Sequence, residues 1–215
     1  MNMRTKQLDH RKVVGRSLAL AAGVLCVLAS ALGADTPTKP RVKAVAPALP
    51  PLNARVLAFA REKLGEKVLD GQCTSLARAA LRSAGARRFP FEGGGDFAWG
   101  EPVPSFREAL PGDVLQFRDA VFEGKRWITK RKWVSWRQEY AHHTAVVAEV
   151  RERGNVVVVL HQNVGANDAP DAEKKVVQEG TIRTNSLKEG GKVWIYRPVP
   201  PAATPEPSGE EAREP

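Results

Sequence analysis

Cysteine is scarce in this sequence: its 215 residues include only Cys26 and Cys73. So few cysteines exclude a disulfide-rich scaffold. Long apolar runs are also missing, because the longest, from Leu18 to Leu32, is short and rich in alanine for a membrane span. Hydrophobic residues make up 42% and charged residues 27% of the chain. This composition is typical of a soluble globular protein and excludes a disordered or membrane-embedded chain.

The N-terminal region has the organisation of an export signal. Five basic side chains precede the apolar run, and small residues close it at Ala31 and Ala34. We therefore expect residues 1–34 to be a signal peptide, with an uncleaved anchor as the alternative. The predicted location is the periplasm, the cell envelope or the medium, with no stable membrane insertion after cleavage.

Two proline-rich stretches bound the predicted domain. Residues 35–52 lack hydrophobic periodicity and are expected to form a linker, and residues 198–215 are expected to be a disordered Pro/Glu tail. The folded domain is then 53–197. If residues 1–34 are removed, Cys73 is the single cysteine left, in an oxidising compartment where a spare thiol is a liability.

The predicted elements give an α+β domain. One helix is expected to be capped by Asn53 and to end at Gly65, and a second to run from Cys73 or Thr74 to Gly85. Residues 86–112 are Gly/Pro-rich and loop-like, with a possible short helix at 105–110. Strands are expected at 113–118, 121–129, 132–137, 143–151, 155–162, 174–184 and 193–197. Helices followed by an antiparallel meander indicate this fold class.

Cys73 is expected in the first turn of the second helix, directly after Gly71 and Gln72. Unpaired backbone N–H groups at a helix start carry partial positive charge, which favours a thiolate and can hold an oxyanion. We therefore interpret Cys73 as a nucleophile, with Gln72 as oxyanion support. The alternative is a small buried core residue.

Three histidines lie on two adjacent predicted strands. An odd connection or a bulge between these strands would pair residue 143 with 163 and place His143, His161 and Asn163 on one face. His143 is then the candidate base, and His161 or Asn163 orients its ring. His142 would point to the opposite face as a surface residue.

Residues 124–137 hold six basic side chains, three tryptophans and no acidic residue. We expect a β-hairpin beside the cleft that binds an anionic polymer through Trp127, Trp133 and Trp136. Nucleic acid fits the same composition but is disfavoured by export. Trp99, in the glycine-rich loop 92–99, is expected to line the other side of the cleft. The alternative is a solvated hairpin with its tryptophans packed below it.

Four motifs in order resemble those of the CHAP amidase/peptidase family, and are similar also to NlpC-type cell-wall endopeptidases. They are Gly71–Thr74, Leu110–Phe117, His143–Val147 and His161–Asn163, and the resemblance covers roughly residues 53–197. It implies a papain-like fold, with N-terminal helices packed on an antiparallel β-sheet or half-barrel, and hydrolysis of peptidoglycan peptide or amide bonds without a metal or cofactor.

By position in this resemblance, Cys73 matches the family nucleophile and His143 the family base. His161 stands where CHAP members usually carry Glu and NlpC-type relatives often carry His, and Asn163 matches the Asn that follows. The leading hypothesis is thus an exported cysteine hydrolase of peptidoglycan. Two alternatives stay open: a non-catalytic module that binds a cell-envelope polymer on the same fold, and a thiol hydrolase of another amide or of a lipid.

Overall fold

A computed structural model describes residues 48–88, 96–165 and 169–201. The predicted signal peptide, most of the linker 35–52 and most of the tail 198–215 lie outside these ranges. Three helices are present there: α1 (Pro51–Glu62), α2 (Cys73–Ser83) and the short α3 (Asp171–Lys174). The described residues also form the strands β1 (Glu101–Val103), β2 (Val114–Thr129), β3 (Lys132–Arg151), β4 (Val156–His161), β5 (Gln178–Arg183) and β6 (Lys192–Arg197). None of these helices has the length and hydropathy of a membrane span.

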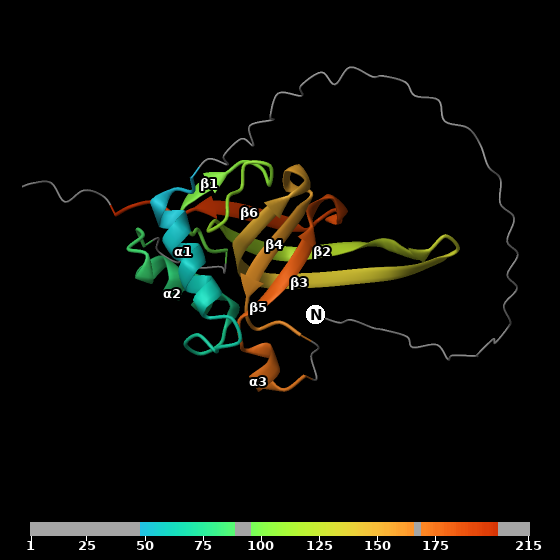
Figure 1. The fold of residues 1–215 in the computed structure, drawn as a ribbon, viewed down its shortest axis with the longest axis horizontal. Helices are drawn as coiled ribbons and strands as arrows, with labels where there is room; N and C mark the ends of the chain where they lie inside the picture. Colours follow the sequence, from blue (N-terminus) through green and yellow to red (C-terminus); the bar gives the residue numbers. More distant parts are fainter. Residues whose placement is uncertain (1–47, 89–95, 166–168, 202–215) are drawn as a thin grey trace, which may run out of the picture. The chain divides into compact units, whose positions relative to one another are not determined.

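The strands form one antiparallel sheet in the order β1-β6-β2-β3-β4-β5 (Figure 1). β2 and β3 pair from Val114↔Val146 out to Thr129↔Lys132. Their outer halves extend away from the rest of the sheet as a long hairpin (Figure 1). The central strands therefore belong to the domain core at one end and to a projecting arm at the other.

Each face of the sheet carries its own apolar cluster, because side chains alternate along a strand. One cluster joins α1 and α2 to the sheet, through residues such as Val56 and Leu76 against Val146 and Leu160. On the other face a second cluster contains Phe117, Phe122, Tyr140, Ala145, Val147, Val159 and Ile182. Burying each large side chain stabilises the fold by roughly 1.5–3 kcal/mol. The face of a residue on β3 therefore decides whether it meets α2 or the second cluster.

The start of α1 differs from the prediction. The helix begins at Pro51, so Asn53 lies inside it and does not cap it. Its side chain is fully buried, and Nδ2 donates to Asp113 Oδ1 at 2.7 Å and to the Pro111 carbonyl at 3.0 Å. The polar group that resembled a cap instead joins α1 to the start of β2. By contrast, α2 begins at Cys73 as predicted, and Gly85 follows it with a φ of 72°.

Several predicted strand boundaries are also wrong. Residues 113–118 and 121–129 form one strand, because Asp119 adopts a φ of 49° without ending the ladder to β3. The predicted strand 174–184 starts late, since α3 occupies its first residue. The expected helix at 105–110 is not formed, and β1 was not predicted. β1 is too short for a periodic pattern and exists through pairing with β6 at the sheet edge, where Pro102 is tolerated.

Candidate active site

Cys73 is the first residue of α2, and Gln72 before it is extended, with φ −73° and ψ 153°. The backbone N–H groups of this first turn have no partner within the helix, and they carry its positive dipole end. The Cys73 side chain is half-buried and free of any disulfide. The helix start therefore holds the sulfur where solvent and backbone donors both reach it.

The thiol is less acidic than its place at a helix start predicted. Burial raises the pKa of the Cys73 thiol above 9.0, and this effect outweighs the opposing hydrogen bonds from the Thr144 backbone, from the backbone of Thr74 and Cys73, and from the Thr144 side chain. The prediction of a thiolate in the free protein is corrected accordingly. Desolvation by the sheet, which the local sequence does not reveal, outweighs the helix dipole.

The sulfur reaches β3 at the residue that follows the candidate base. Thr144 points toward α2, in line with Val146 and Ala148 of the first cluster. The preceding His143 side chain points to the second cluster, where its ring lies 6.0 Å from Phe117 and stacks on Tyr140 at 5.0 Å. Cys73 and His143 thus meet at one position of β3 but on different sides of its backbone. Among the described residues, no hydrogen bond joins thiol and imidazole.

His143 and His161 lie against one another in the buried second cluster. His143 Nε2 is 3.1 Å from His161 Nδ1, and the two rings meet edge to face at 5.2 Å and 74°. Their shared face results from a bulge between Val147 and Glu149 in the β3–β4 ladder, which confirms the register predicted from an odd connection or a bulge.

Burial keeps both of these imidazoles neutral. Desolvation lowers the pKa of His143 well below 6.5, and the nearby His161 and His142 lower it further. Desolvation alone lowers the pKa of His161 to about 4. A neutral pair shares one proton across the Nε2···Nδ1 contact. When His143 Nε2 is the donor, its Nδ1 is left as a proton acceptor, which is the tautomer that a general base requires.

Asn163 does not approach the His143 ring, which corrects one alternative for the orienting residue. β4 ends at His161, and Asn163 turns away with a φ of 60°. Its Nδ2 donates to Gln72 Oε1 at 3.0 Å. The end of β4 therefore holds the residue before Cys73, which leaves His161 as the partner of His143.

Gln162 is a site residue that the sequence analysis did not select. It is fully buried, and its Nε2 donates to the carbonyls of Gln72 at 2.7 Å and Val68 at 3.1 Å, while its Oε1 accepts from the Val68 N–H at 3.2 Å. These three bonds fix the loop that leads into α2. Gln162 lies between His161 and Asn163, which were both selected at the end of a predicted strand. This position was the signal that could have identified it.

A second unselected group lies behind the sulfur. Gln116 Oε1 accepts hydrogen bonds from Thr144 Oγ1 at 2.8 Å and from Trp99 Nε1 at 3.1 Å, and all three side chains are buried. Trp99 was predicted to line an open cleft, but it is only 4% exposed. The indole is instead part of a polar chain that ends at the Thr144–Cys73 contact.

Trp127, Trp133 and Trp136 belong to the outer part of the β2–β3 ladder, which projects from the sheet as a hairpin (Figure 1). They do not lie beside Cys73, which corrects their predicted place. Trp127 and Trp133 face each other across the strands and are 66% and 46% exposed. Lys125 Nζ lies 4.4 Å from the Trp133 ring centroid, a cation–π contact. Trp136 is half-buried over Gly124. Among the described residues, the large exposed aromatic side chains therefore lie near the hairpin tip.

His142 is exposed and contacts Phe97, with ring centroids 5.4 Å apart. It lies on the opposite face from His143, as predicted. Within the ranges that the structure describes, no three His, Cys, Asp or Glu side chains are grouped to hold a metal ion.

Comparison with known proteins gives one assignment. A family model described as the AIM3/BBC1 cysteine proteinase-fold domain matches residues 34–206. A search of curated proteins and a search of solved structures returned no significant match. The match spans most of the chain and includes both Cys73 and His143. The chain therefore belongs to the AIM3/BBC1 cysteine proteinase-fold domain family, and its fold is that of the papain-like cysteine proteinases.

Proposed function

We propose that the protein is a thiol hydrolase in which Cys73 is the nucleophile and His143 the general base. One observation carries this proposal: on a cysteine proteinase fold, the sulfur at the start of α2 touches the residue after His143, whose ring is fixed by His161 at 3.1 Å. The proposed nucleophile, base and orienting group thus come from α2, β3 and β4, with the sulfur and the imidazole on different sides of the β3 backbone.

In this proposal the free enzyme holds a neutral thiol beside a neutral imidazole. Proton transfer requires substrate binding to bring the sulfur and His143 Nδ1 together, because the free protein holds them on different sides of the β3 backbone. The proton moves from sulfur to Nδ1, and the thiolate attacks the scissile carbonyl. Backbone N–H groups at the start of α2 stabilise the oxyanion, whereas the Gln72 N–H donates to Asp70 Oδ1 at 3.1 Å. His143 then protonates the leaving amine, and water releases the acyl group.

We further propose that the substrate is peptidoglycan, cleaved at peptide or amide bonds. Support comes from the four motifs that resemble CHAP- and NlpC-type hydrolases and from the predicted signal peptide, which implies action in the envelope or outside the cell. The hairpin tip supplies the binding surface: Trp127 and Trp133 stack on sugar rings, and the adjacent basic side chains hold acidic groups of the polymer.

The test is digestion of purified peptidoglycan, with the products identified by mass. Wild-type protein is expected to release fragments with one new amine and one new carboxylate per cut. Cys73→Ala and His143→Ala are expected to release none. His142 lies on the same face of β3 as Thr144, which the sulfur contacts. Activity retained by His142→Gln therefore supports His143 as the base, whereas loss of activity in that variant would assign the base to His142. Release of fragments by Cys73→Ala would refute the mechanism. Wild-type activity on another amide or on a lipid, without activity on peptidoglycan, would refute the proposed substrate.

A non-catalytic binding module is the second candidate. Two observations favour it: burial raises the pKa of the Cys73 thiol, and no hydrogen bond links this thiol to His143 among the described residues. A binder sediments with peptidoglycan through its hairpin but leaves the polymer intact. Its thiol also reacts with iodoacetamide at the same rate in wild type and His143→Ala, whereas an enzyme loses reactivity in that variant.

A further inference from the structure

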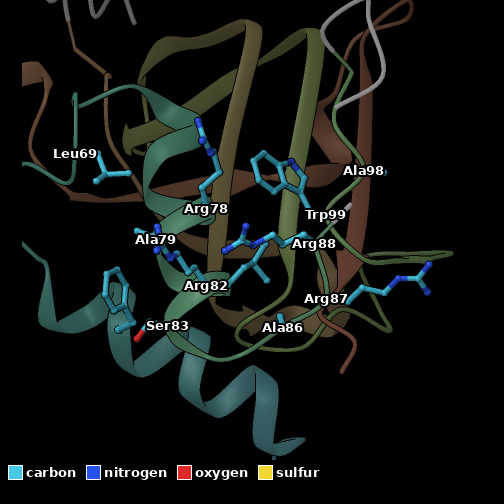
Figure 2. Close-up of a pocket in the computed structure, with 12 residues that line it drawn as sticks. Leu69, Arg78, Ala79, Arg82, Ser83, Ala86, Arg87, Arg88, Ala98 and Trp99 are labelled. Atoms are coloured by element: carbon cyan, nitrogen blue, oxygen red, sulfur yellow. The ribbon is translucent and has the colours of Figure 1, made fainter. Parts of the chain in front are cut away.

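A cavity of about 680 Å³ lies along α2, on the side of the helix that α1 and Trp99 border (Figure 2). Most of its lining lies between Leu69, four residues before Cys73, and Arg88, past the end of α2, and Phe59, Ala98 and Trp99 complete it. Neither Cys73 nor His143 lines it. The cavity is thus separate from the proposed nucleophile but runs beside the helix that carries it.

The charged side chains that line this cavity, among the described residues, are all basic. Arg78, Arg82, Arg87 and Arg88 line it, and none of the described lining residues is acidic. Arg82 and Arg88 lie toward the middle of the close-up, whereas Arg87 extends away from them (Figure 2). Within the described ranges, no ion pair joins Arg82 or Arg88 to a carboxylate. Guanidinium groups bind carboxylate and phosphate through paired N–H donors.

The remaining walls are apolar. Phe59, Leu81 and Trp99 contribute side chains, and Leu69 stands at the rim with 66% of its surface exposed and a φ of 53°. A leucine with positive φ is strained, and such residues cluster at functional sites. The volume lies within the roughly 300–1,000 Å³ of small-molecule sites and exceeds what an inorganic anion fills. The ligand chemistry is therefore an anion on an organic chain.

The cavity is linked to the proposed site in two ways. Trp99, in its wall, bonds Gln116, which bonds Thr144, whose side chain reaches the Cys73 sulfur. Arg78 and Arg82 follow Cys73 on the same helix, roughly 8 and 14 Å along its axis at ~1.5 Å per residue, and about 140° and 180° around it at ~3.6 residues per turn. A peptide that reaches both the sulfur and the cavity must therefore pass around α2 as well as along it.

From this arrangement we propose that the cavity binds the carboxylates of an acidic peptide whose scissile bond lies at Cys73. The inference rests on the proposed function for the cleavage, but the binding itself does not require catalysis. It assigns to the substrate acidic side chains whose carboxylates pair with Arg82 and Arg88 while their aliphatic stems lie on Trp99 and Leu81.

The binding test uses the full chain carrying Cys73→Ala and a fluorescein-labelled tetraglutamate peptide, with tetraglutamine as its neutral match. Tetraglutamate is expected to bind at least tenfold more tightly than tetraglutamine. Arg82→Gln/Arg88→Gln is expected to weaken tetraglutamate binding tenfold or more. The control Arg107→Gln/Lys192→Gln, which removes two exposed cations elsewhere, is expected to change it less than twofold. Equal loss in both double variants, or equal binding of both peptides, overturns the proposal.

Two further arms separate the possible outcomes. Pyrophosphate that displaces tetraglutamate at equal or lower concentration would assign the cavity to phosphate and overturn the peptide assignment. In wild-type protein, glutamate peptides with a scissile amide are expected to show a higher kcat/KM than glutamine peptides of the same length. Tetraglutamate binding without any cleavage refutes the proposed function alone, whereas cleavage without charge preference refutes the cavity proposal alone.

Discussion

The buried imidazole of His161 makes the stability of the domain sensitive to acid. Its pKa is about 4 in the folded protein against 6.5 when unfolded, because burial penalises the charged ring. The unfolded chain therefore binds its proton first as the pH falls, so the stabilisation is complete above pH 6.5 and is lost progressively toward pH 4. A pKa difference of about 2.5 corresponds to a loss of about 2 kcal/mol between roughly pH 7.5 and pH 5.

Urea unfolding at those two pH values measures this loss. With a typical urea dependence of ~1–3 kcal/mol per M, the wild-type midpoint is expected to fall by on the order of 1 M. His161→Gln keeps a polar group near His143 but cannot titrate there, so it is expected to lose less than wild type, with the buried His143 ring accounting for the remaining loss. The exposed His142→Gln is the matched control that behaves like wild type. The same fall in wild type and His161→Gln would refute the assignment, as would a His161 ring that titrates above pH 6 by NMR.

Three further predictions follow from the same contacts. Thr144→Val removes a hydrogen bond that lowers the pKa of the Cys73 thiol, so we expect this pKa to rise and iodoacetamide labelling to slow at neutral pH; unchanged labelling kinetics would contradict the contact. Gly180→Ala places a methyl group 2.6 Å from His161 Nε2, so the ring must shift, at a cost of about 1–3 kcal/mol in unfolding free energy together with loss of hydrolysis; an unperturbed melting curve and activity would show that the ring has room. Trp127→Ala, at a side chain 66% exposed, is expected to change stability by less than about 0.5 kcal/mol while reducing sedimentation with peptidoglycan, and retained sedimentation would remove the hairpin from the binding surface.

Local patterns predicted what depends on neighbouring residues. Gly71 and Gly85 bounded α2 and placed Cys73 at its start. The alternation of side chains, together with a bulge, placed His143 and His161 on one face. These features follow from periodicity and turn chemistry, which are readable in a single sequence.

Tertiary packing decided what the sequence could not. Burial under the sheet made the thiol less acidic than its helix position predicted. Asn163 turned toward Gln72 because β4 ended before it, and Trp99 entered the core because Gln116 offers its indole an acceptor. The relevant partners are up to 91 residues apart in the chain, so no local pattern contains them.

The carboxylate of Asp113 joins a segment that is synthesised early to one that is synthesised late. It is fully buried, and its partners are Asn53 of α1, at 2.7 Å, and Arg197 at the end of β6, at 3.0 Å. A buried charge without its counter-ion costs several kcal/mol. The domain therefore cannot reach its final stability until the last strand has been synthesised, and a chain cut before Arg197 would carry this deficit permanently. Such late completion suits a protein proposed to cross a membrane before it folds.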